Sequence, residues 1–462
     1  MSQDKKPADR HIIEKIAEVP AVALDSTVAK TEQLARSLPK AKTIKKTKQY
    51  WNVLGPGLTT GASDDDPSGI ATYSQAGAQY GFGLLWLSTF TFPLMAIVQE
   101  MCARIGIVTG RGLAGNIRAH FSRRVLYICT LLLFAANAFN IGADLGAMAK
   151  AVQLLKPELS FGLIVISFAA LSILLQIYLP YARYARYLKW LALILLAYVV
   201  SALLAHLDWS AVFQKAFVPT IHWSKEQLIL ITAILGTTIS PYLFFWQTSQ
   251  EVENQIQEGK KSLASRQGSS KREIKSMRID VWSGMLLSNL VMFFIIAAAG
   301  AILFPAGITQ IHSAAEAAEA LRPFAGNATF WLFALGIIGT GLLAIPVLAG
   351  SSSYAVSESL RWQGGLNRKL KQAHAFYGIL IISVLIGLAI NFLDIDPIKA
   401  LIYAAVVNGI VAPVILALIV IISSNKKIMG DWVNRRRTTW LGWMVTSLMV
   451  LAGAAAIFSL FG

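Results

Sequence analysis

The sequence predicts an all-α polytopic membrane protein built from eleven membrane spans. Three observations lead to this fold class: the composition, the recurrence of long apolar segments, and a break in two of those segments. Of the 462 residues, 55% are hydrophobic and only 14% are charged, and the mean hydropathy is +0.56. This composition is typical of a chain that lies mostly within a bilayer.

The apolar segments are long enough to cross the hydrocarbon core of a bilayer as helices. The loops between them are too short for a soluble domain, so we expect one membrane domain after an N-terminal tail of residues 1–50. The spans are expected near residues 51–78, 82–107, 123–153, 159–180, 187–206, 226–255, 279–304, 328–356, 373–392, 398–424 and 438–461.

Basic residues in the loops alternate from one side of the predicted membrane to the other. The loops on one side hold 24 of the 41 Lys and Arg, those on the other side hold six, and the tail of residues 1–50 holds eleven. This positive-inside pattern predicts a multi-pass protein of the inner (plasma) membrane with a cytoplasmic N-terminus. The net charge of +16 is therefore explained by the lipid bilayer as partner, so neither nucleic acid nor an obligate protein partner is inferred.

An acidic cluster interrupts the first predicted span. A carboxylate at membrane depth costs about 3 kcal/mol or more, so acidic residues there point to a function. Pro67 removes a backbone donor and Gly69 weakens the helix, so the helix is expected to break beside the carboxylates. At about 100° of rotation per residue, Asp64 and Asp65 are not expected to face the same cavity. The cluster reads Asp64-Asp65-Asp66-Pro67-Ser68-Gly69.

The sixth predicted span contains a second break. Pro241 lies in its middle, and small or polar residues precede the proline in the sequence ILGTTISPYLFFWQTSQEVE. The two broken spans are five spans apart, which predicts two halves of opposite topology, residues 51–206 and 226–424, with residues 438–461 as an additional span. Paired broken helices in inverted halves indicate a transport site between them, near the middle of the membrane.

The residues at the two breaks favour a hard cation. Asp66 is expected both to cap the helix that begins at Pro67 and to supply an anionic oxygen ligand. Neither break contains Cys, His or Met, so Mg²⁺, Ca²⁺ or Mn²⁺ suits the site better than copper or zinc. A single Asp among small polar groups fits a Mg²⁺ ion that keeps part of its hydration shell. The second break contributes oxygen atoms from Thr237, Thr238, Ser240 and Tyr242.

Two N-terminal segments resemble the Nramp family of proton-coupled divalent metal transporters. The segment GPGLTTGASDDDPSGIATYSQAGAQYGFGLLW resembles the first span of that family, and QEMCARIGIVTGRGLAGNIRAHF resembles its second span and the following loop. With the second break and the eleven-span layout, the resemblance covers the whole chain. It implies a LeuT-like fold of five plus five inverted spans. It also implies that the metal is the transported substrate, with no cofactor.

The resemblance places four metal-site residues in this sequence. The family's first-span Asp-Pro-Gly-Asn motif reads Asp66-Pro67-Ser68-Gly69 here, so the Asp ligand is kept and the Asn ligand is replaced by Gly69. The loss of the Asn amide is expected to free space for an ion-bound water. Ser240 stands where the family has a metal-binding Met, and Thr237 takes the position that offers a backbone carbonyl. Without the Met sulfur, the preference for transition metals should weaken.

The resemblance also implies an altered proton route. Tyr242 replaces the family's His after the proline, and a second family His falls at Gln247. Two acidic residues in the family's third span align with Asn140 and Ala143 of this chain, and Asp144 lies one position after the second of these. Since a proton relay needs groups that titrate near the working pH, strict proton coupling is not expected. These departures are similar to the Nramp-related magnesium transporter branch, so Mg²⁺ is favoured while Mn²⁺ stays open.

Other polar residues have two interpretations. Asp65, Ser68, Thr238, Asn140, Asp144 and Asn408 are expected to line the site, although interhelical hydrogen bonding would also explain the asparagines. Glu251 and Glu253 are expected at a solvated helix end, with a role in a vestibule as the alternative. The alternative functions are a proton-coupled Mn²⁺/Fe²⁺ transporter and a cation-coupled organic-solute symporter on the same fold. An intramembrane aspartyl protease would need a second carboxylate from another span, which the second break lacks, so no enzymatic activity is expected.

Overall fold

The structure is a computed structural model that describes residues 55–179, 196–204, 207–311, 314–319, 326, 329–393 and 395–461. Throughout these residues the regular secondary structure is helical, with no β-strand. The tail of residues 1–50 lies outside the described residues, as does most of the fifth predicted span. Eight of the described helical segments are long and apolar enough to cross a membrane, and α19 (His374–Ile390) is a shorter apolar helix.

The helices follow the predicted spans closely. Spans two, three and four are α5 (Leu85–Thr109), α7 (Arg123–Leu155) and α8 (Phe161–Tyr178), and the described part of span five is α10 (Leu196–Leu204). Spans seven, eight, ten and eleven are α15 (Lys271–Ile302), α18 (Thr329–Leu360), α20 (Pro397–Ser423) and α22 (Arg436–Phe461). Short connecting helices include α6 (Leu113–His120), α11 (Trp209–Phe217), α14 (Leu263–Arg266), α16 (Ala314–Glu319) and α21 (Lys426–Met429).

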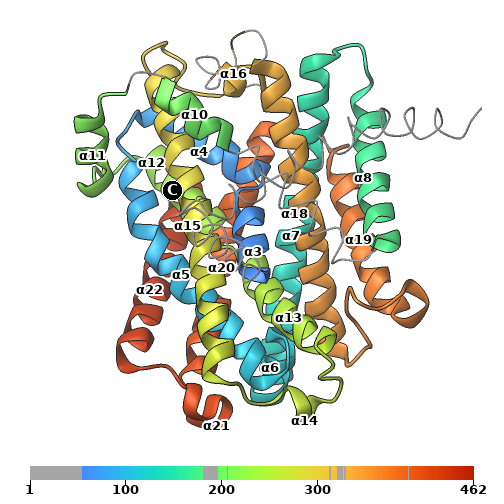
Figure 1. Cartoon of the computed structure of the whole chain (residues 1–462). Helices are drawn as coiled ribbons and strands as arrows, with labels where there is room; N and C mark the ends of the chain where they lie inside the picture. The colour runs from blue at the N-terminus through green and yellow to red at the C-terminus, as the bar shows by residue number, and fades with distance from the viewer. Residues whose placement is uncertain are drawn as a thin grey trace, which may run out of the picture. The chain divides into compact units, whose positions relative to one another are not determined.

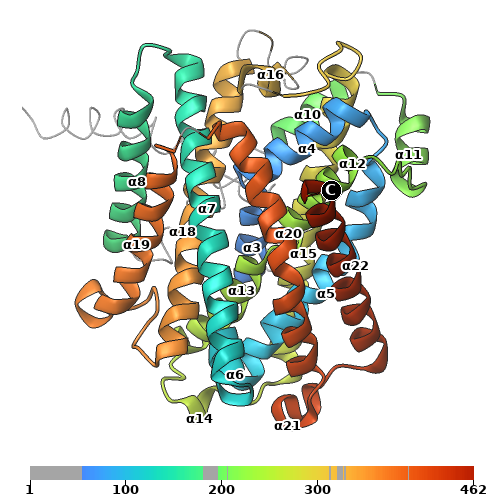
Figure 2. The same ribbon diagram turned by 180° about the vertical axis from the view of Figure 1, so that it is seen from behind.

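The first and sixth spans are each broken into two helices, as expected. The first consists of α3 (Pro56–Asp64) and α4 (Pro67–Tyr80), and the sixth of α12 (Lys225–Thr238) and α13 (Pro241–Gln257). Pro67 and Pro241 each occupy the first turn of the second helix, where the missing backbone N–H costs nothing. Figures 1 and 2 show α3 and α13 in the interior, while α8 and α19 form one flank and α22 lies on the opposite side.

A carboxylate from another span caps the beginning of α3. Asp280 in α15 accepts hydrogen bonds from the backbone N–H groups of Gly55 and Gly57 at 2.7 Å and of Leu58 at 3.1 Å. These are amides that a helix cannot satisfy by itself, and a negative charge there is also favoured by the helix dipole. Asp280 therefore ties the first half of the broken span to α15.

Glycines allow α3 to pack directly on α15. A Cβ atom at Gly61 would lie 2.2 Å from the backbone oxygen of Gly284, and one at Gly284 would lie 2.1 Å from the oxygen of Gly57. Such backbone contact is a common way for membrane helices to associate, because small residues permit close van der Waals packing. The position of α3 is thus determined by shape as well as by the cap at Asp280.

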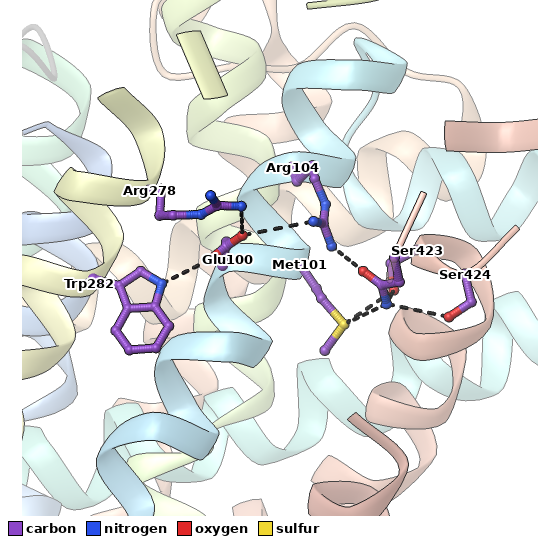
Figure 3. Close-up of polar contacts among 8 residues, drawn as sticks. Glu100, Met101, Arg104, Arg278, Trp282, Ser423 and Ser424 are labelled. Atoms are coloured by element: carbon purple, nitrogen blue, oxygen red, sulfur yellow. Dashed lines mark hydrogen bonds and ion pairs between the residues drawn. The ribbon is translucent and has the colours of Figure 1, made fainter. Parts of the chain in front are cut away.

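A buried polar cluster joins α5 to α15 and to the start of α22 (Figure 3). Glu100 in α5 accepts hydrogen bonds from Arg278 and from the indole of Trp282, both at 2.8 Å. Arg104, one turn further along α5, lies 3.8 Å from the same carboxylate and donates a hydrogen bond to Asn434. The cluster holds the second span in place beside the broken first span, since α15 also packs on α3 and α4.

Candidate metal site

Asp66 lies at the first break and caps α4. Its Oδ1 accepts hydrogen bonds from the backbone N–H of Gly69 at 2.7 Å and from the hydroxyl of Ser68 at 2.6 Å. Its Oδ2 accepts a hydrogen bond from the side-chain amide of Asn140 in α7 at 3.0 Å. The capping role expected for Asp66 is confirmed. A carboxylate with two oxygens still has lone pairs available for a cation beside these three donors.

Two further polar side chains of α7 accompany Asp66. Asn140 and Asp144 are four residues apart, so they share one face of α7, and that face meets Asp66 through Asn140. Both residues are completely buried. Within the described part of the chain, neither the amide oxygen of Asn140 nor either carboxyl oxygen of Asp144 has a hydrogen-bond partner. Buried oxygens are rarely left without a partner, so these atoms are candidates for contact with a cation or its waters.

Asp64 and Asp65 face a different helix from the one that Asp66 faces. The hydroxyl of Ser288 in α15 lies 2.6 Å from Oδ2 of Asp64 and 3.5 Å from Oδ1 of Asp65. The prediction that they would not share one cavity relied on the rotation of a regular helix, whereas the two carboxylates approach the same hydroxyl. Asp65 ends α3 with φ −85° and ψ 51°, outside the helical range, and this turns its side chain.

At the second break, side-chain hydroxyl groups donate short hydrogen bonds to backbone oxygens at the end of α12. The hydroxyl of Ser240 lies 2.7 Å from the backbone oxygens of both Gly236 and Thr237, so it caps the end of α12. The hydroxyl of Thr238 donates to the backbone oxygen of Ile234 at 2.8 Å. The Ser240 oxygen keeps its lone pairs, and the Thr237 carbonyl keeps one. A cation at this break would meet hydroxyl and carbonyl oxygens, which are hard ligands.

Tyr242 connects the two breaks directly. Its hydroxyl donates a 2.9 Å hydrogen bond to the backbone oxygen of Ser63, near the end of α3. In an unbroken helix that carbonyl would accept a hydrogen bond from the residue four positions later, but this residue is Pro67, which has no N–H. The Tyr242 hydroxyl supplies the missing donor. Tyr242 is fully buried. It acts as a structural bridge between the broken helices, whereas the sequence placed it only as a lining residue.

Gly69 does not open space at the site. A Cβ atom there would lie 3.2 Å from the Asp64 backbone oxygen, 3.2 Å from Oγ1 of Thr237 and 3.3 Å from the ring of Tyr73. The expectation that the loss of an Asn amide leaves room for an extra water was therefore wrong, because these neighbours fill the volume. The same contacts bring Thr237 of the second break against the first break.

A polar chain that the sequence did not indicate runs from α3 into α13. Thr60 donates a 2.5 Å hydrogen bond to Gln247, and Gln247 donates a 2.9 Å hydrogen bond to Glu251. Glu251 and Glu253 are buried, and Glu253 accepts a hydrogen bond from Tyr354 at 3.2 Å. The expected solvated helix end was wrong, because Glu251 packs against α5 at Gly106, while Tyr354 of α18 and Asn367 of the following loop contact Glu253. A buried carboxylate beside Gln247 also provides a titratable group near the second break.

Asn408 takes a place consistent with a lining role. It is buried in α20, which packs against α4 and α7, and neither of its amide atoms has a hydrogen-bond partner among the residues that the structure describes. No group of three Asp, Glu, His or Cys side chains gathers closely enough to hold an ion in the same described set. A cation here would meet the Asp66 carboxylate, with the Asp144 carboxyl group close enough to interact with Asp66, and neutral oxygens would complete its coordination.

The residues of the site are shielded from solvent. Asp66 and Thr237 are 1% exposed, and Ser240 is fully buried. Transport requires that such a site open alternately, so this arrangement represents an occluded state of the two broken helices.

Comparison with known families agrees with this geometry. The family model described as "Natural resistance-associated macrophage protein-like", or Nramp, matches residues 57–459. The chain belongs to the Nramp family. Because Nramp proteins are membrane transporters, the chain is a multi-pass transporter rather than an enzyme, and a bound metal is substrate rather than cofactor.

Several curated relatives span nearly the whole chain. The divalent metal cation transporter MntH of Klebsiella pneumoniae is 26% identical over 419 residues, which cover 89% of this chain and 95% of the relative. MntH of Caldanaerobacter subterraneus is 25% identical and covers 90% of this chain and 95% of the relative. MntH of Deinococcus radiodurans is also 25% identical, over 88% of this chain and 90% of the relative.

Solved structures share the fold of this Nramp chain. A manganese transporter from Eremococcus coleocola superposes with a TM-score of 0.68 at 20% identity, over 89% of this chain and 87% of that one. Mhp1, a nucleobase-cation-symport-1 family transporter, superposes with a TM-score of 0.55 at 13% identity, over 88% and 91%. The predicted LeuT-like fold with a broken first and sixth span is thereby confirmed.

Proposed function

We propose that this Nramp protein carries a divalent metal cation across the membrane, that Mg²⁺ is its preferred substrate, and that Asp66 holds the ion between the two broken helices. The proposal rests on one observation above all. The Asp66 carboxylate caps α4 between the two breaks and meets the Asn140 amide of α7, and Thr237 of the second break lies against Gly69 of the same turn. We assign Gly69, Thr237 and Ser240 to the same site through their backbone or hydroxyl oxygens.

The donor set supports Mg²⁺ over softer metals. Mg²⁺ binds through one or two carboxylates and keeps several waters, whereas sulfur and imidazole ligands would favour transition metals. Asp65, Ser68, Thr238, Tyr242, Asn140, Asp144 and Asn408 remain the lining residues of the proposal. Mn²⁺ is the second substrate that the same oxygens would accept, and the MntH names of the relatives favour it.

Transport in this proposal needs no strict proton coupling. Tyr242 and Gln247 stand where a relay would need titratable groups, and both are engaged in hydrogen bonds to neighbouring helices. An inside-negative potential contributes about 2.3 kcal/mol per charge per 100 mV, so it could drive a divalent cation inward without protons. We place the protein in the plasma membrane with a cytoplasmic N-terminus, on the basis of the loop charges.

The decisive experiment is divalent uptake into proteoliposomes with simultaneous recording of internal pH. Mg²⁺ and Mn²⁺ are compared for the wild-type protein and for Asp66→Asn. Asn caps a helix about as well as Asp, so this variant removes the charge while keeping the start of α4. We expect Mg²⁺ uptake without proton entry in the wild type, and loss of that uptake in Asp66→Asn.

Asp396→Asn is a matched control. Asp396 also precedes a proline and also caps a helix, accepting hydrogen bonds from Ile398 and Lys399 at 3.0 Å, but it is exposed at the end of α20. Its substitution should leave uptake unchanged. Equal uptake by wild type and Asp66→Asn would disprove the role of Asp66.

A proton-coupled Mn²⁺ or Fe²⁺ transporter is the second candidate. The observation that favours it is the buried Asp144 carboxyl group, which has no hydrogen-bond partner in the described residues and interacts electrostatically with Asp66. Such a group could exchange a proton when a cation binds. Mn²⁺ entry together with protons, in the absence of Mg²⁺ entry, would establish this function. A cation-coupled organic-solute symporter would instead show uptake of a labelled organic solute that Asp66→Asn abolishes.

A further inference from the structure

A cavity of about 680 Å³ opens between α6, α13, α18 and the loop that follows α18. It lies at the end of the molecule that carries α6 and α14, which Figure 1 shows at the bottom, and it shares no lining residue with the metal site. Its lining is rich in cations. The positively charged residues are Arg111, Arg118, Lys261, Arg266, Arg361 and Arg368.

The acidic residues of the cavity are already used by the protein. Glu358 accepts hydrogen bonds from the backbone N–H of Gly115 at 2.8 Å and from the hydroxyl of Ser249 at 3.5 Å. Glu253 accepts hydrogen bonds from Tyr354 and Asn367. Glu253 is buried and Glu358 is half-buried in the wall, and these two carboxylates face six Lys and Arg side chains, so the cavity keeps an excess of positive charge.

Arg111, Arg118 and Arg361 line one part of the cavity and repel one another, and Glu358 offsets part of this repulsion at Arg118. In the described residues, neither the Arg111 nor the Arg361 side chain has a hydrogen-bond or salt-bridge partner, while Arg118 donates to the Glu358 backbone oxygen at 2.8 Å. Burial lowers the pKa of Arg118, the charges of Arg361 and Arg111 lower it further, and the charge of Glu358 raises it in part. Mutual repulsion of this kind is relieved when a multivalent anion binds.

The backbone holds Arg361 in a costly conformation. It has φ 61°, and it is the only residue other than glycine with positive φ in the described ranges. Arg361 occupies the position after a helix where glycine is usual, and the N–H of Trp362 closes the motif on the Ser357 oxygen at 2.8 Å. Strained residues cluster at functional sites, so Arg361 is a candidate for a role that depends on its charge.

A buried hydroxyl also faces the cavity. Ser357 lines it and is 1% exposed, yet its Oγ has no hydrogen-bond partner among the residues described. Trp362, which is 43% exposed, contributes a flat apolar wall. Guanidinium groups and a hydroxyl donor can hydrogen-bond the oxygens of a phosphate group, and the Trp362 ring can pack on the rest of a molecule that carries the phosphate.

We propose that this cavity binds a phosphate-bearing anion of the size of a nucleoside polyphosphate, with Arg111, Arg118 and Arg361 on the phosphates and Ser357 as a hydroxyl donor. The same phosphate chemistry could be presented by a soluble nucleotide or by a lipid headgroup. An anion held there would bridge α6, α13 and α18. Because α13 is the second half of the broken sixth span, bound phosphate would slow transport by restraining its movement.

The test is equilibrium binding to the full chain in detergent micelles with EDTA present, measured by isothermal titration calorimetry. ATP, inorganic triphosphate and inorganic phosphate are the soluble probes. We expect triphosphate and ATP to bind the wild type, and Arg361→Gly to weaken binding by about tenfold, which corresponds to about 1.4 kcal/mol. Glycine relieves the positive φ, so this variant should unfold at the same temperature as the wild type or higher.

Ser357→Ala provides a second variant, since the hydroxyl has no intramolecular bond to lose, and it should weaken binding several-fold. Arg436→Gln removes an exposed arginine that does not line the cavity, and it should bind as the wild type does. Asp66→Asn should also bind normally, so this test is independent of the metal site.

Vesicles of phosphatidylcholine with phosphatidic acid show whether the phosphate comes from a lipid headgroup or from a soluble molecule. If they displace triphosphate from the wild type, the lipid headgroup uses the same phosphate site; if they do not, the ligand is soluble. Absence of triphosphate and phosphatidic acid binding by the wild type would overturn the proposal. Unchanged binding by both Arg361→Gly and Ser357→Ala would overturn it as well.

Discussion

The hydroxyl of Tyr242 donates a 2.9 Å hydrogen bond to the backbone oxygen of Ser63, and this bond joins the two broken spans at their breaks. Tyr242 belongs to the first turn of α13 and Ser63 to the last turn of α3. Each break leaves backbone groups that no bilayer lipid can satisfy, so the two halves of the fold satisfy one another. The bond also couples the position of α3 to that of α13 in this occluded state.

Removal of this bridge is expected to destabilise the occluded state. Tyr242→Phe leaves a buried carbonyl unpaired, which should lower stability by about 1–3 kcal/mol. Thermal unfolding in detergent measures the loss, and metal uptake into proteoliposomes measures its effect on transport. Tyr377→Phe is the control, because Tyr377 makes the same kind of bond, 2.7 Å to the Arg368 backbone oxygen, away from both breaks. Only Tyr242→Phe should change uptake, and equal uptake changes in both variants would contradict the bridging role.

A softer ligand at the second break should change ion preference. Ser240→Cys replaces the hydroxyl by a thiol of similar size, and thiolate ligands favour soft metals. We expect Cd²⁺ to inhibit Mg²⁺ uptake at about tenfold lower concentration than in the wild type, a difference of about 1.4 kcal/mol. Ser383→Cys controls for a new buried thiol, since Ser383 is also fully buried and bonds the backbone of its own helix, α19. If the two variants respond alike to Cd²⁺, Ser240 does not contact the ion.

The buried cluster around Glu100 should contribute much more to stability than an exposed ion pair. Glu100→Gln leaves the Arg104 side chain, which is 8% exposed, without its carboxylate, and the expected loss is about 3 kcal/mol. Glu273→Gln removes the exposed pair with Lys260 at 2.7 Å, but Gln can keep the capping box with Ser270, so the expected loss is below about 1 kcal/mol. Thermal unfolding of both variants compares the two. A larger loss in Glu273→Gln would contradict the assignment.

The sequence by itself determined the spans, the two breaks and the capping role of Asp66. These features depend on local properties: apolar length, the missing N–H of proline, and the preference of Asp for the position before Pro67. Each of them acts within a few residues along the chain, so no knowledge of packing was needed. The replacement of sulfur by oxygen at Ser240 is equally a matter of residue identity.

Only the tertiary structure decided which groups meet. Asp64 and Asp65 reach Ser288 because α15 packs on α3 through glycines, and Glu251 and Glu253 are buried because they pack against α5 and α18, respectively. The space expected at Gly69 is filled by a side chain from the other half of the fold, Thr237. In each case the partner lies more than a hundred residues away or on another helix, and its distance depends on how backbones pack, which no local pattern records.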